Sequence, residues 1–319
     1  MKDRLGREID YIRISITDRC NLRCGYCMPE CGVPSVPHDK ILRFDEIVRL
    51  VKIFCSLGIK NVKITGGEPL VRKGAVGLIK DIKAIDGIEK VSLTTNGILL
   101  SENLNALAEA GIEGINISLD TLDRQKYMKI TGFDGLNTVL KVIDECRAFP
   151  EIKIKINAVT MADYNRDEIC KLADFASEAG ATLRFIEMMP IGLGTGFGGY
   201  NQDEIMTVLE EAYGPAKTIN EEVGSGPAKY YSFEGLKGRI GFISPISHKF
   251  CRSCNRIRLT SEGLLRPCLG SEMGTDLRKP MRDDASDEEL ASLICEEIMN
   301  KPAGHCFEAT DSLMSKIGG

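Results

Sequence analysis

Cys20-Asn21-Leu22-Arg23-Cys24-Gly25-Tyr26-Cys27 follows directly after Tyr11–Thr17, an apolar run that is typical of a β-strand. The three cysteines, called the first triad below, have the spacing C-x3-C-x2-C. A 4Fe–4S cluster normally takes four cysteine ligands, one for each iron. Three ligands leave one iron open to a small molecule, which predicts a cluster that performs chemistry rather than one that only stores electrons.

The spacing of the first triad, with Tyr26 before its last cysteine, resembles that of the radical S-adenosylmethionine (SAM) enzymes. The resemblance implies that the open iron binds the amino and carboxylate groups of SAM, and that one electron then releases a 5′-deoxyadenosyl radical. The alternative is a zinc knuckle in which Cys31 supplies a fourth thiolate. Zinc sites favour two C-x2-C pairs, which the triplet lacks, so we interpret Cys31 as a bystander.

Size and composition limit the other functions of the chain. A chain of 319 residues can hold one large α/β domain and a smaller one. The net charge of −5 provides no basic field for nucleic acid or a membrane surface. No apolar run approaches the length of a membrane span, and Met1–Gly6 is too polar for a signal peptide. Twelve cysteines in such a chain predict reduced thiols and a cytoplasmic protein.

Short β-rich runs alternate with amphipathic helical patterns from Tyr11 to about Met189. Six β/α units in series predict an α/β fold, with a parallel sheet curled into a full or partial barrel and helices outside. The predicted strands are Tyr11–Thr17, Asn61–Thr65, Lys90–Thr95, Gly114–Leu119, Lys153–Val159 and Thr182–Glu187. The predicted helices include Asp45–Leu57, Ser101–Ala110, Asp134–Arg147 and Asp167–Ala179.

Polar or glycine-rich residues follow every one of these strands. After the first triad these are Thr65-Gly66-Gly67-Glu68-Pro69, Thr94-Thr95-Asn96-Gly97, Ser118-Leu119-Asp120, Asn157 and Glu187-Met188-Met189-Pro190. Such residues also simply terminate strands. Their occurrence at all six ends favours a shared site at one rim, where ligands of such folds collect.

The composition changes after Pro190. Ile191–Tyr200 contains five glycines and is interpreted as a linker or mobile loop. We place a domain boundary near residue 195, so that residues 1–195 form the barrel domain and residues 196–319 a smaller α+β domain. The predicted elements of the second domain are Gln202–Tyr213, Ala228–Phe233, Arg239–Ile243, Arg256–Thr260, Leu264–Cys268 and Asp287–Met299.

A second triad of cysteines, Cys251, Cys254 and Cys268, has the spacing C-x2-C-x13-C. A turn at Ser261–Gly263 can return Cys268 to the other two. Three thiolates again leave one metal position open. His248 lies three residues before Cys251, so a Cys3His zinc site is the alternative, and spacing alone does not separate zinc from an iron–sulfur cluster. The first triad favours a second cluster.

Arginines on the predicted strands indicate an anionic ligand. Arg256 and Arg258 lie two residues apart and therefore share one face of a strand. A pair of guanidinium groups beside a metal site suits a polyphosphate or a carboxylate, although an exposed charged face is the more common explanation. Arg13 lies in the first strand, and an arginine inside a barrel is costly unless an anion meets it.

Longer motifs resemble those of one radical SAM family, the GTP 3′,8-cyclases or molybdenum cofactor biosynthesis A proteins. These motifs are Tyr11-Ile12-Arg13-Ile14-Ser15-Ile16-Thr17-Asp18-Arg19-Cys20, Thr65–Pro69, the segment from Gly241 to Leu269, and the terminal Ile317-Gly318-Gly319. The resemblance runs nearly end to end. It implies an incomplete (β/α)6 barrel whose open side is closed by the C-terminal domain.

The resemblance also implies roles for individual residues. The first triad would hold the cluster that binds SAM, and the second triad an auxiliary 4Fe–4S cluster that meets the guanine ring. The implied SAM contacts are Tyr26, Gly67, Ser118 and Met189, and the implied GTP contacts are Arg13, Lys63, Thr94, Lys155, Arg256 and Arg258. Arg13, Gly318 and Gly319 would be catalytic, with the glycine tail threading into the barrel because only glycine passes through so crowded a space.

The implied reaction is that of a lyase, which converts GTP to 3′,8-cyclo-7,8-dihydro-GTP with two 4Fe–4S clusters and SAM. The implied partners are a reductant such as flavodoxin or ferredoxin, and a downstream cyclic pyranopterin monophosphate synthase. Neither nucleic acid nor a membrane is expected as a partner, and a homodimer stays open. The alternatives are a radical SAM peptide-modifying enzyme, which usually has more C-terminal cysteines, and a non-enzymatic iron–sulfur or zinc protein.

Overall fold

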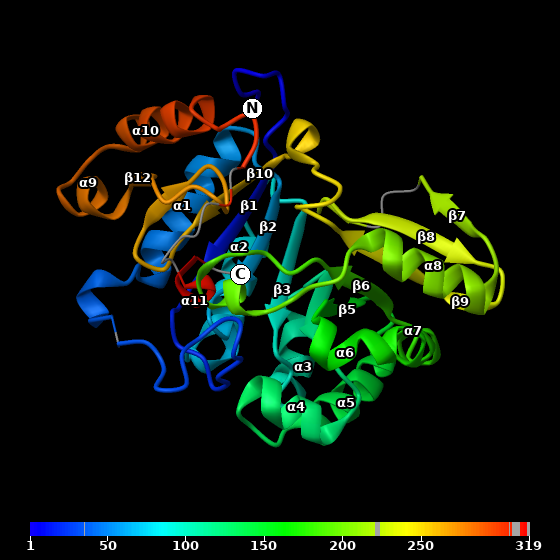
Figure 1. Cartoon of the computed structure of the whole chain (residues 1–319). Coiled ribbons are helices and arrows are strands. Elements are labelled where there is room, and N and C mark those ends of the chain that lie inside the picture. Colours follow the sequence, from blue (N-terminus) through cyan, green and yellow to red (C-terminus); the bar gives the residue numbers. More distant parts are fainter. Residues whose placement is uncertain (35, 221–223, 306, 308–312, 318–319) are drawn as a thin grey trace.

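The computed structural model describes residues 1–34, 36–220, 224–305, 307 and 313–317 (Figure 1). Its centre is a sheet whose first six strands run parallel and in chain order. These strands are β1 (Tyr11–Ser15), β2 (Asn61–Thr65), β3 (Lys90–Thr95), β4 (Gly114–Ser118), β5 (Lys153–Val159) and β6 (Thr182–Ile186). The predicted α/β fold with a parallel sheet is confirmed, and three strands end one or two residues earlier than predicted.

The C-terminal strands extend this sheet at both of its edges. β10 (Arg256–Leu259) pairs in parallel with β1, and β9 (Leu236–Ile243) pairs in parallel with β6. The outer strands pair antiparallel, with β11 (Leu264–Arg266) and β12 (Thr275–Asp276) at one edge and β8 (Lys229–Phe233) and β7 (Ala216–Ile219) at the other. The resulting order is β12-β11-β10-β1-β2-β3-β4-β5-β6-β9-β8-β7. The C-terminal part therefore flanks the six-unit barrel on both sides.

Helices cover the outside of the sheet (Figure 1). The longer ones are α1 (Phe44–Ser56), α2 (Ala75–Lys83), α3 (Leu100–Glu109), α5 (Leu136–Glu145), α7 (Ile169–Glu178), α8 (Gln202–Tyr213) and α10 (Asp287–Met299), and the shorter ones are α4 (Arg124–Thr131), α6 (Ala162–Asn165), α9 (Arg278–Arg282) and α11 (Met314–Ile317). Neighbouring helices touch, so that α1 packs on α2 and α10, α2 on α3, and α3 on α5. Within the described residues, no helix has the length and apolar character needed to cross a membrane.

Each long helix buries one apolar stripe, and α1 is an example. Ile47, Leu50 and Phe54 recur at helical spacing and are fully buried against the sheet. Burying one such side chain stabilises the fold by roughly 1.5–3 kcal/mol. This outer layer fixes the strands, and the register of the strands then decides which polar side chains meet on the inner face.

The strand register aligns polar residues in rows across the inner face. Arg13 in β1 is paired with Arg258 in β10 on one side and with Lys63 in β2 on the other. Further along the sheet, Asn157 in β5 is paired with Ser118 in β4 and with Arg184 in β6. Since side chains alternate between the two faces of a strand, paired residues point the same way. The register therefore gathers cations at β10-β1-β2 and polar groups at β4-β5-β6.

The glycine-rich segment 191–200 differs from the predicted linker. It forms a 3-10 turn over Gly192–Gly196 and packs against the barrel. Phe197 meets Tyr26 of the first triad's loop edge-on, with the ring centroids 6.1 Å apart. A Cβ atom on Gly194 would come within 2.5 Å of the carbonyl oxygen of Met189. The glycines therefore permit close packing here, whereas the composition predicted a linker or mobile loop.

Candidate active site

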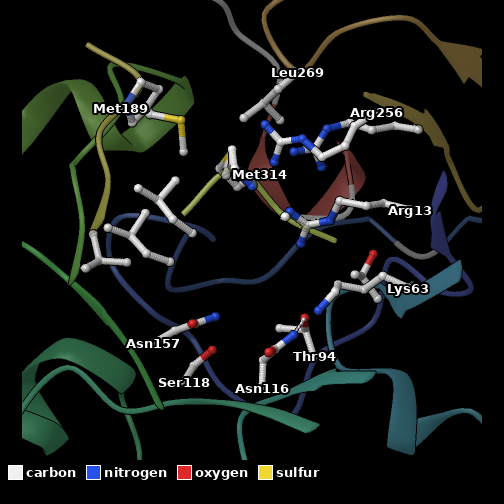
Figure 2. Close-up of a pocket in the computed structure, with 18 of the residues that line it drawn as sticks. Arg13, Lys63, Thr94, Asn116, Ser118, Asn157, Met189, Arg256, Leu269 and Met314 are labelled. Atoms are coloured by element: carbon white, nitrogen blue, oxygen red, sulfur yellow. Dashed lines mark hydrogen bonds between the residues drawn. The ribbon is translucent and has the colours of Figure 1, made fainter. Parts of the chain in front are cut away.

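One cavity opens inside the sheet at the carboxyl ends of the parallel strands (Figure 2). It encloses about 300 Å³, and since a single water needs roughly 10–15 Å³, it has room for organic ligands. Both triads line it, together with residues from the strand ends and from the C-terminal segment. Figure 2 shows Arg13, Lys63 and Arg256 along one side, with Ser118 and Met189 across from them.

The loop of the first triad is held in place by the end of α4. The backbone amides of Arg23 and Gly25 donate hydrogen bonds to the carbonyl oxygens of Thr131 and Ile130, at 2.8 and 2.9 Å. Cys27 N–H donates back to the carbonyl oxygen of Cys24 at 2.8 Å. None of the three cysteines forms a disulfide, and all three line the cavity.

The Gly66-Gly67-Glu68 stretch after β2 packs directly against this loop. A Cβ atom on Gly67 would lie 2.4 Å from the carbonyl oxygen of Arg19, so only glycine fits there. The Glu68 carboxylate accepts hydrogen bonds from the backbone amides of Asn96 at 2.7 Å and Leu70 at 3.0 Å. Burial raises the pKa of Glu68 to about 7, despite these hydrogen bonds.

A second buried carboxylate lies on the other side of the first triad. The Tyr26 hydroxyl donates to Asp120 Oδ2 at 2.8 Å, and the Val159 backbone amide donates to Asp120 Oδ1 at 2.8 Å. Burial raises the pKa of Asp120 to about 6. The pair ties the tyrosine that precedes the last cysteine of the triad to β4 and β5, and it fixes the position of that loop across the barrel.

The β10–β11 hairpin brings the second triad together. The two strands pair antiparallel, with Leu259 opposite Leu265, and the chain then returns Cys268 toward Cys251 and Cys254. None of these three cysteines forms a disulfide, and all three line the same cavity as the first triad. The hairpin that the sequence predicted for this purpose is present.

The histidine that meets the second triad is not the one that the sequence suggested. His248 Nε2 lies 2.9 Å from Asp203 Oδ1, on the surface. His305 instead places Nδ1 3.1 Å from Cys251 Sγ, while its Nε2–H donates to the Pro245 carbonyl oxygen at 2.8 Å. Among the described residues, no three His, Cys, Asp or Glu side chains lie close enough together to hold a single metal ion. A cube of four irons spaces its cysteines more widely, because each binds a different iron.

Buried cations form part of the wall of the same cavity. Lys63 is 8% exposed, and its pKa lies well below its ordinary value because of burial and, after that, the charges of Arg184 and Arg13. Burial likewise lowers the pKa of Arg13 to about 10, and the pKa of Arg258 falls well below its usual range for the same reason. Buried like charges are costly without a partner, so this group of cations favours a strongly anionic ligand.

Arg184 belongs to this wall and was missed in the sequence. Its Nε donates to Asn157 Oδ1 at 2.8 Å and its Nη2 to Asn116 Oδ1 at 2.7 Å, which aims the guanidinium across the inner face. The residue lies in the apolar run Thr182–Ile186, where a single cation is the same signal that drew attention to Lys63. The sequence therefore contains the same indication for Arg184 as for Lys63.

The structure places most of the predicted site residues in this one cavity. Those that line it are Cys20, Cys24, Cys27, Tyr26, Gly67, Ser118, Met189, Arg13, Lys63, Thr94, Arg256, Arg258, Cys251, Cys254 and Cys268. Lys155 lies outside the lining, with its Nζ against Gly224, where an added Cβ would be 2.5 Å away. Gly318 and Gly319 fall outside the described residues, but Met314 of α11 reaches the cavity (Figure 2).

The donor sets fit two iron–sulfur clusters. Each triad offers three cysteines that are not in disulfides, and thiolates are the preferred ligands of such clusters. Each triad also faces the cavity, so a fourth position on either cluster would be reached from the space between them. The donors thus suit groups that bind a ligand as well as the protein.

Two family models match the chain. Residues 14–176 match the radical SAM superfamily, and residues 181–307 match a family described as Molybdenum Cofactor Synthesis C. Together with the parallel-stranded fold and the first triad, these matches define a radical SAM enzyme, whose cofactors are 4Fe–4S clusters and SAM.

Full-length relatives narrow the family further. The chain is 47% identical to the GTP 3′,8-cyclase of Clostridium perfringens, 44% identical to that of Thermodesulfovibrio yellowstonii and 43% identical to that of Pelotomaculum thermopropionicum. Each alignment covers 100% of both chains. The chain belongs to the GTP 3′,8-cyclase family.

Solved structures share the fold. The crystal structure of Streptococcus suis SuiB matches with a TM-score of 0.65 at 17% identity, over 94% of this chain and 73% of SuiB. SuiB bound to S-adenosylmethionine matches over the same shares, with a TM-score of 0.63 and 17% identity. At this identity the likeness supports the fold of the radical SAM barrel and does not indicate the substrate.

Proposed function

We propose that this chain is a GTP 3′,8-cyclase, which converts GTP to 3′,8-cyclo-7,8-dihydro-GTP in the first step of molybdenum cofactor biosynthesis. One observation carries the proposal: two cysteine triads, with no disulfide among them, line one cavity together with buried cations. The full-length relatives named GTP 3′,8-cyclase support it. A peptide-modifying enzyme would not need a wall of cations built for a polyanion.

The first triad would hold the cluster that binds SAM, with Tyr26, Gly67, Ser118 and Met189 around SAM. When bound, this cluster and SAM supply a 5′-deoxyadenosyl radical. The chain's own residues then have two tasks here. Gly67 lets the backbone pass close to the loop, and Tyr26 is fixed by its 2.8 Å hydrogen bond to Asp120. Both tasks would keep the loop, and with it SAM, in a fixed position relative to the C3′ hydrogen of GTP. This is an orientation effect.

The cations would hold GTP. Arg256 and Arg258 on β10 and Arg13 and Lys63 on the neighbouring strands would bind the triphosphate, since guanidinium groups grip phosphate oxygens bidentately. Thr94 would add a hydroxyl from β3, and Lys155 would act on the same anion from behind the lining. Arg13 lies at the centre of this set and touches the substrate in this assignment. Binding energy gained at the phosphates is remote from the reacting atoms and can hold them in place.

The second triad would hold an auxiliary cluster that meets guanine, so that C3′ of the ribose and C8 of the base come together between the two triads. Gly318 and Gly319 would be catalytic. Enclosure protects a radical from water and oxygen, while the hard chemistry belongs to the cofactor.

The division of labour along the chain is part of the proposal. Residues 1–195 would carry the radical chemistry, and residues 196–319 the substrate and the auxiliary cluster. A flavodoxin or ferredoxin would supply the electron, and a cyclic pyranopterin monophosphate synthase would consume the product. The setting would be the cytoplasm.

Anaerobic incubation with reductant, SAM and GTP, followed by mass analysis of the product, tests the activity. We expect 5′-deoxyadenosine and the cyclised nucleotide in equal amounts. Arg258→Ala should weaken GTP binding about ten- to hundredfold, since a hydrogen bond to a charged group is worth roughly 1.5–3 kcal/mol. Arg239→Ala removes the same charge from an exposed site on β9 and is the matched control. Deoxyadenosine without any change in GTP would count against the proposal.

A further inference from the structure

A lysine from the C-terminal segment lies beside the second triad. Lys301 is 6% exposed and lines the cavity. Its Nζ donates to the carbonyl oxygen of Arg256 at 2.7 Å and to that of Pro267 at 2.6 Å. Arg256 lies two residues after Cys254, and Pro267 directly precedes Cys268. One ammonium group therefore joins the backbone beside two of the three cysteines.

A buried arginine joins the third cysteine to the same segment. Arg7 donates from Nη1 to the carbonyl oxygen of Cys251 at 2.9 Å, and from Nη2 to those of Lys301 at 3.1 Å and Pro302 at 2.9 Å. Its Nε is paired with Asp3 Oδ2 at 2.6 Å. Arg7 and Lys301 thus hold the backbone at all three positions of the second triad, from opposite ends of the chain.

The two cations differ in how their charges are balanced. The charge of Arg7 is offset by the buried carboxylate of Asp3. Lys301 donates its two hydrogen bonds to neutral carbonyl groups. Burial lowers the pKa of Lys301, and the groups that oppose this effect are Cys254 and Cys268. A buried ammonium is costly without a negative neighbour, and cysteines that ligate a metal are thiolates.

We propose that Lys301 is a positioning residue of the auxiliary cluster: it holds the hairpin backbone beside Cys254 and Cys268, and its positive charge raises the reduction potential of the cluster bound there. With Arg7 it keeps the second triad arranged for that cluster. The inference rests on the proposed function, because it takes the second triad as the cluster's ligands. A nearby positive charge favours the reduced cluster, which carries one more negative charge.

The test is a redox titration of the full-length holoenzyme, followed by EPR. The signal that changes on adding SAM belongs to the first triad, and the signal that changes on adding GTP belongs to the second. We compare Lys301→Met, which keeps the length of the side chain but removes its charge and donors, with Lys301→Arg, which keeps the charge. Lys249→Met, at an exposed lysine two residues before Cys251, is the matched control.

At the midpoint potential of the wild-type cluster, the ratio of reduced to oxidised auxiliary cluster should fall at least tenfold in Lys301→Met, which is 59 mV for one electron. Lys301→Arg and Lys249→Met should stay within a factor of two, and the SAM-responsive cluster should not change. If Lys301→Met loses the auxiliary cluster while Lys301→Arg keeps it, the positioning role is supported.

Two results would overturn the inference. One is an unchanged potential in a Lys301→Met enzyme that keeps both clusters. The other is an equal loss of the auxiliary cluster in Lys301→Met and Lys301→Arg, because charge would then not matter. A wild-type enzyme that binds no second cluster by iron content and EPR would instead contradict the proposed function, so the two failures are distinguishable.

Discussion

The contribution of Lys155 to GTP binding should weaken as the pH rises from 6 to 8. Burial, and after it the charge of Arg184, lowers the pKa of the Lys155 ammonium to about 7 in the ligand-free protein. A bound triphosphate would restore this pKa toward the usual value of about 10.4. Binding therefore takes up a proton at Lys155 wherever the free protein has lost it. A base whose pKa is raised by the ligand binds that ligand best below its free pKa.

The size of the effect follows from the two pKa values. With a free pKa of about 7, Lys155 is about nine-tenths protonated at pH 6 and about one-tenth protonated at pH 8, so its contribution lowers the affinity about tenfold across this range. Proton uptake at Lys155 should be about half a proton at pH 7 and close to one at pH 8. Lys63 adds to the effect in the same direction, because burial also lowers its pKa.

Isothermal titration calorimetry measures both quantities on the holoenzyme, under anaerobic conditions without SAM or reductant, in buffers of different ionisation enthalpy. The terminal phosphate of GTP also titrates near neutral pH and acts in the opposite direction, so variants are needed. Lys155→Met should lose its share of the pH dependence, and Lys155→Arg should keep full affinity at pH 8. Parallel pH profiles for the wild type and Lys155→Met would refute the reasoning.

Three further outcomes are expected. Cys24→Ala should abolish SAM cleavage, whereas Cys268→Ala should mainly reduce GTP turnover; equal loss of SAM cleavage in both folded variants would contradict separate roles for the triads. Gly67→Ala should cost the first cluster, measured as iron content, because its Cβ would lie 2.4 Å from a backbone oxygen, while Gly77→Ala, with open space around it, should not. Deleting residues 318–319 should leave both clusters and the melting temperature unchanged but sharply lower cyclisation; full-length activity in the truncated enzyme would show the tail to be dispensable.

The strands were predictable because their pattern is local. All six parallel strands are short, rich in β-branched residues and bounded by polar or glycine residues. The strands that end earlier than predicted do so for a physical reason. Thr17, for example, no longer extends the strand but uses its carbonyl oxygen to receive Gly67 N–H at 2.8 Å. After β1 the chain leaves the sheet and forms part of the rim at the carboxyl ends of the strands.

Elements whose purpose is to support the site were harder to predict. α4 has the polar sequence Arg124–Thr131 and no strong apolar stripe, so periodicity does not reveal it. Its position becomes understandable only from the carbonyl groups with which it holds the first triad's loop. The segment 191–200 was misread for a related reason. Its glycines permit backbone contacts at close range, and composition alone does not separate close packing from freedom of movement.

Cations show where sequence reasoning reaches its limit. Lys63 and Arg13 lie inside apolar strands, and a charge in such a place is a local anomaly that a reader of the sequence can see. Lys301 and Arg7 lie in irregular segments, where a basic residue is ordinary. Apart from the Arg7–Asp3 pair, their partners are 34 to 295 residues away, so no pattern of spacing connects them to the cysteines. The cysteines of the second triad are therefore visible from the sequence, whereas the groups that hydrogen-bond to the backbone around it emerge only when both ends of the chain are seen to meet at the hairpin.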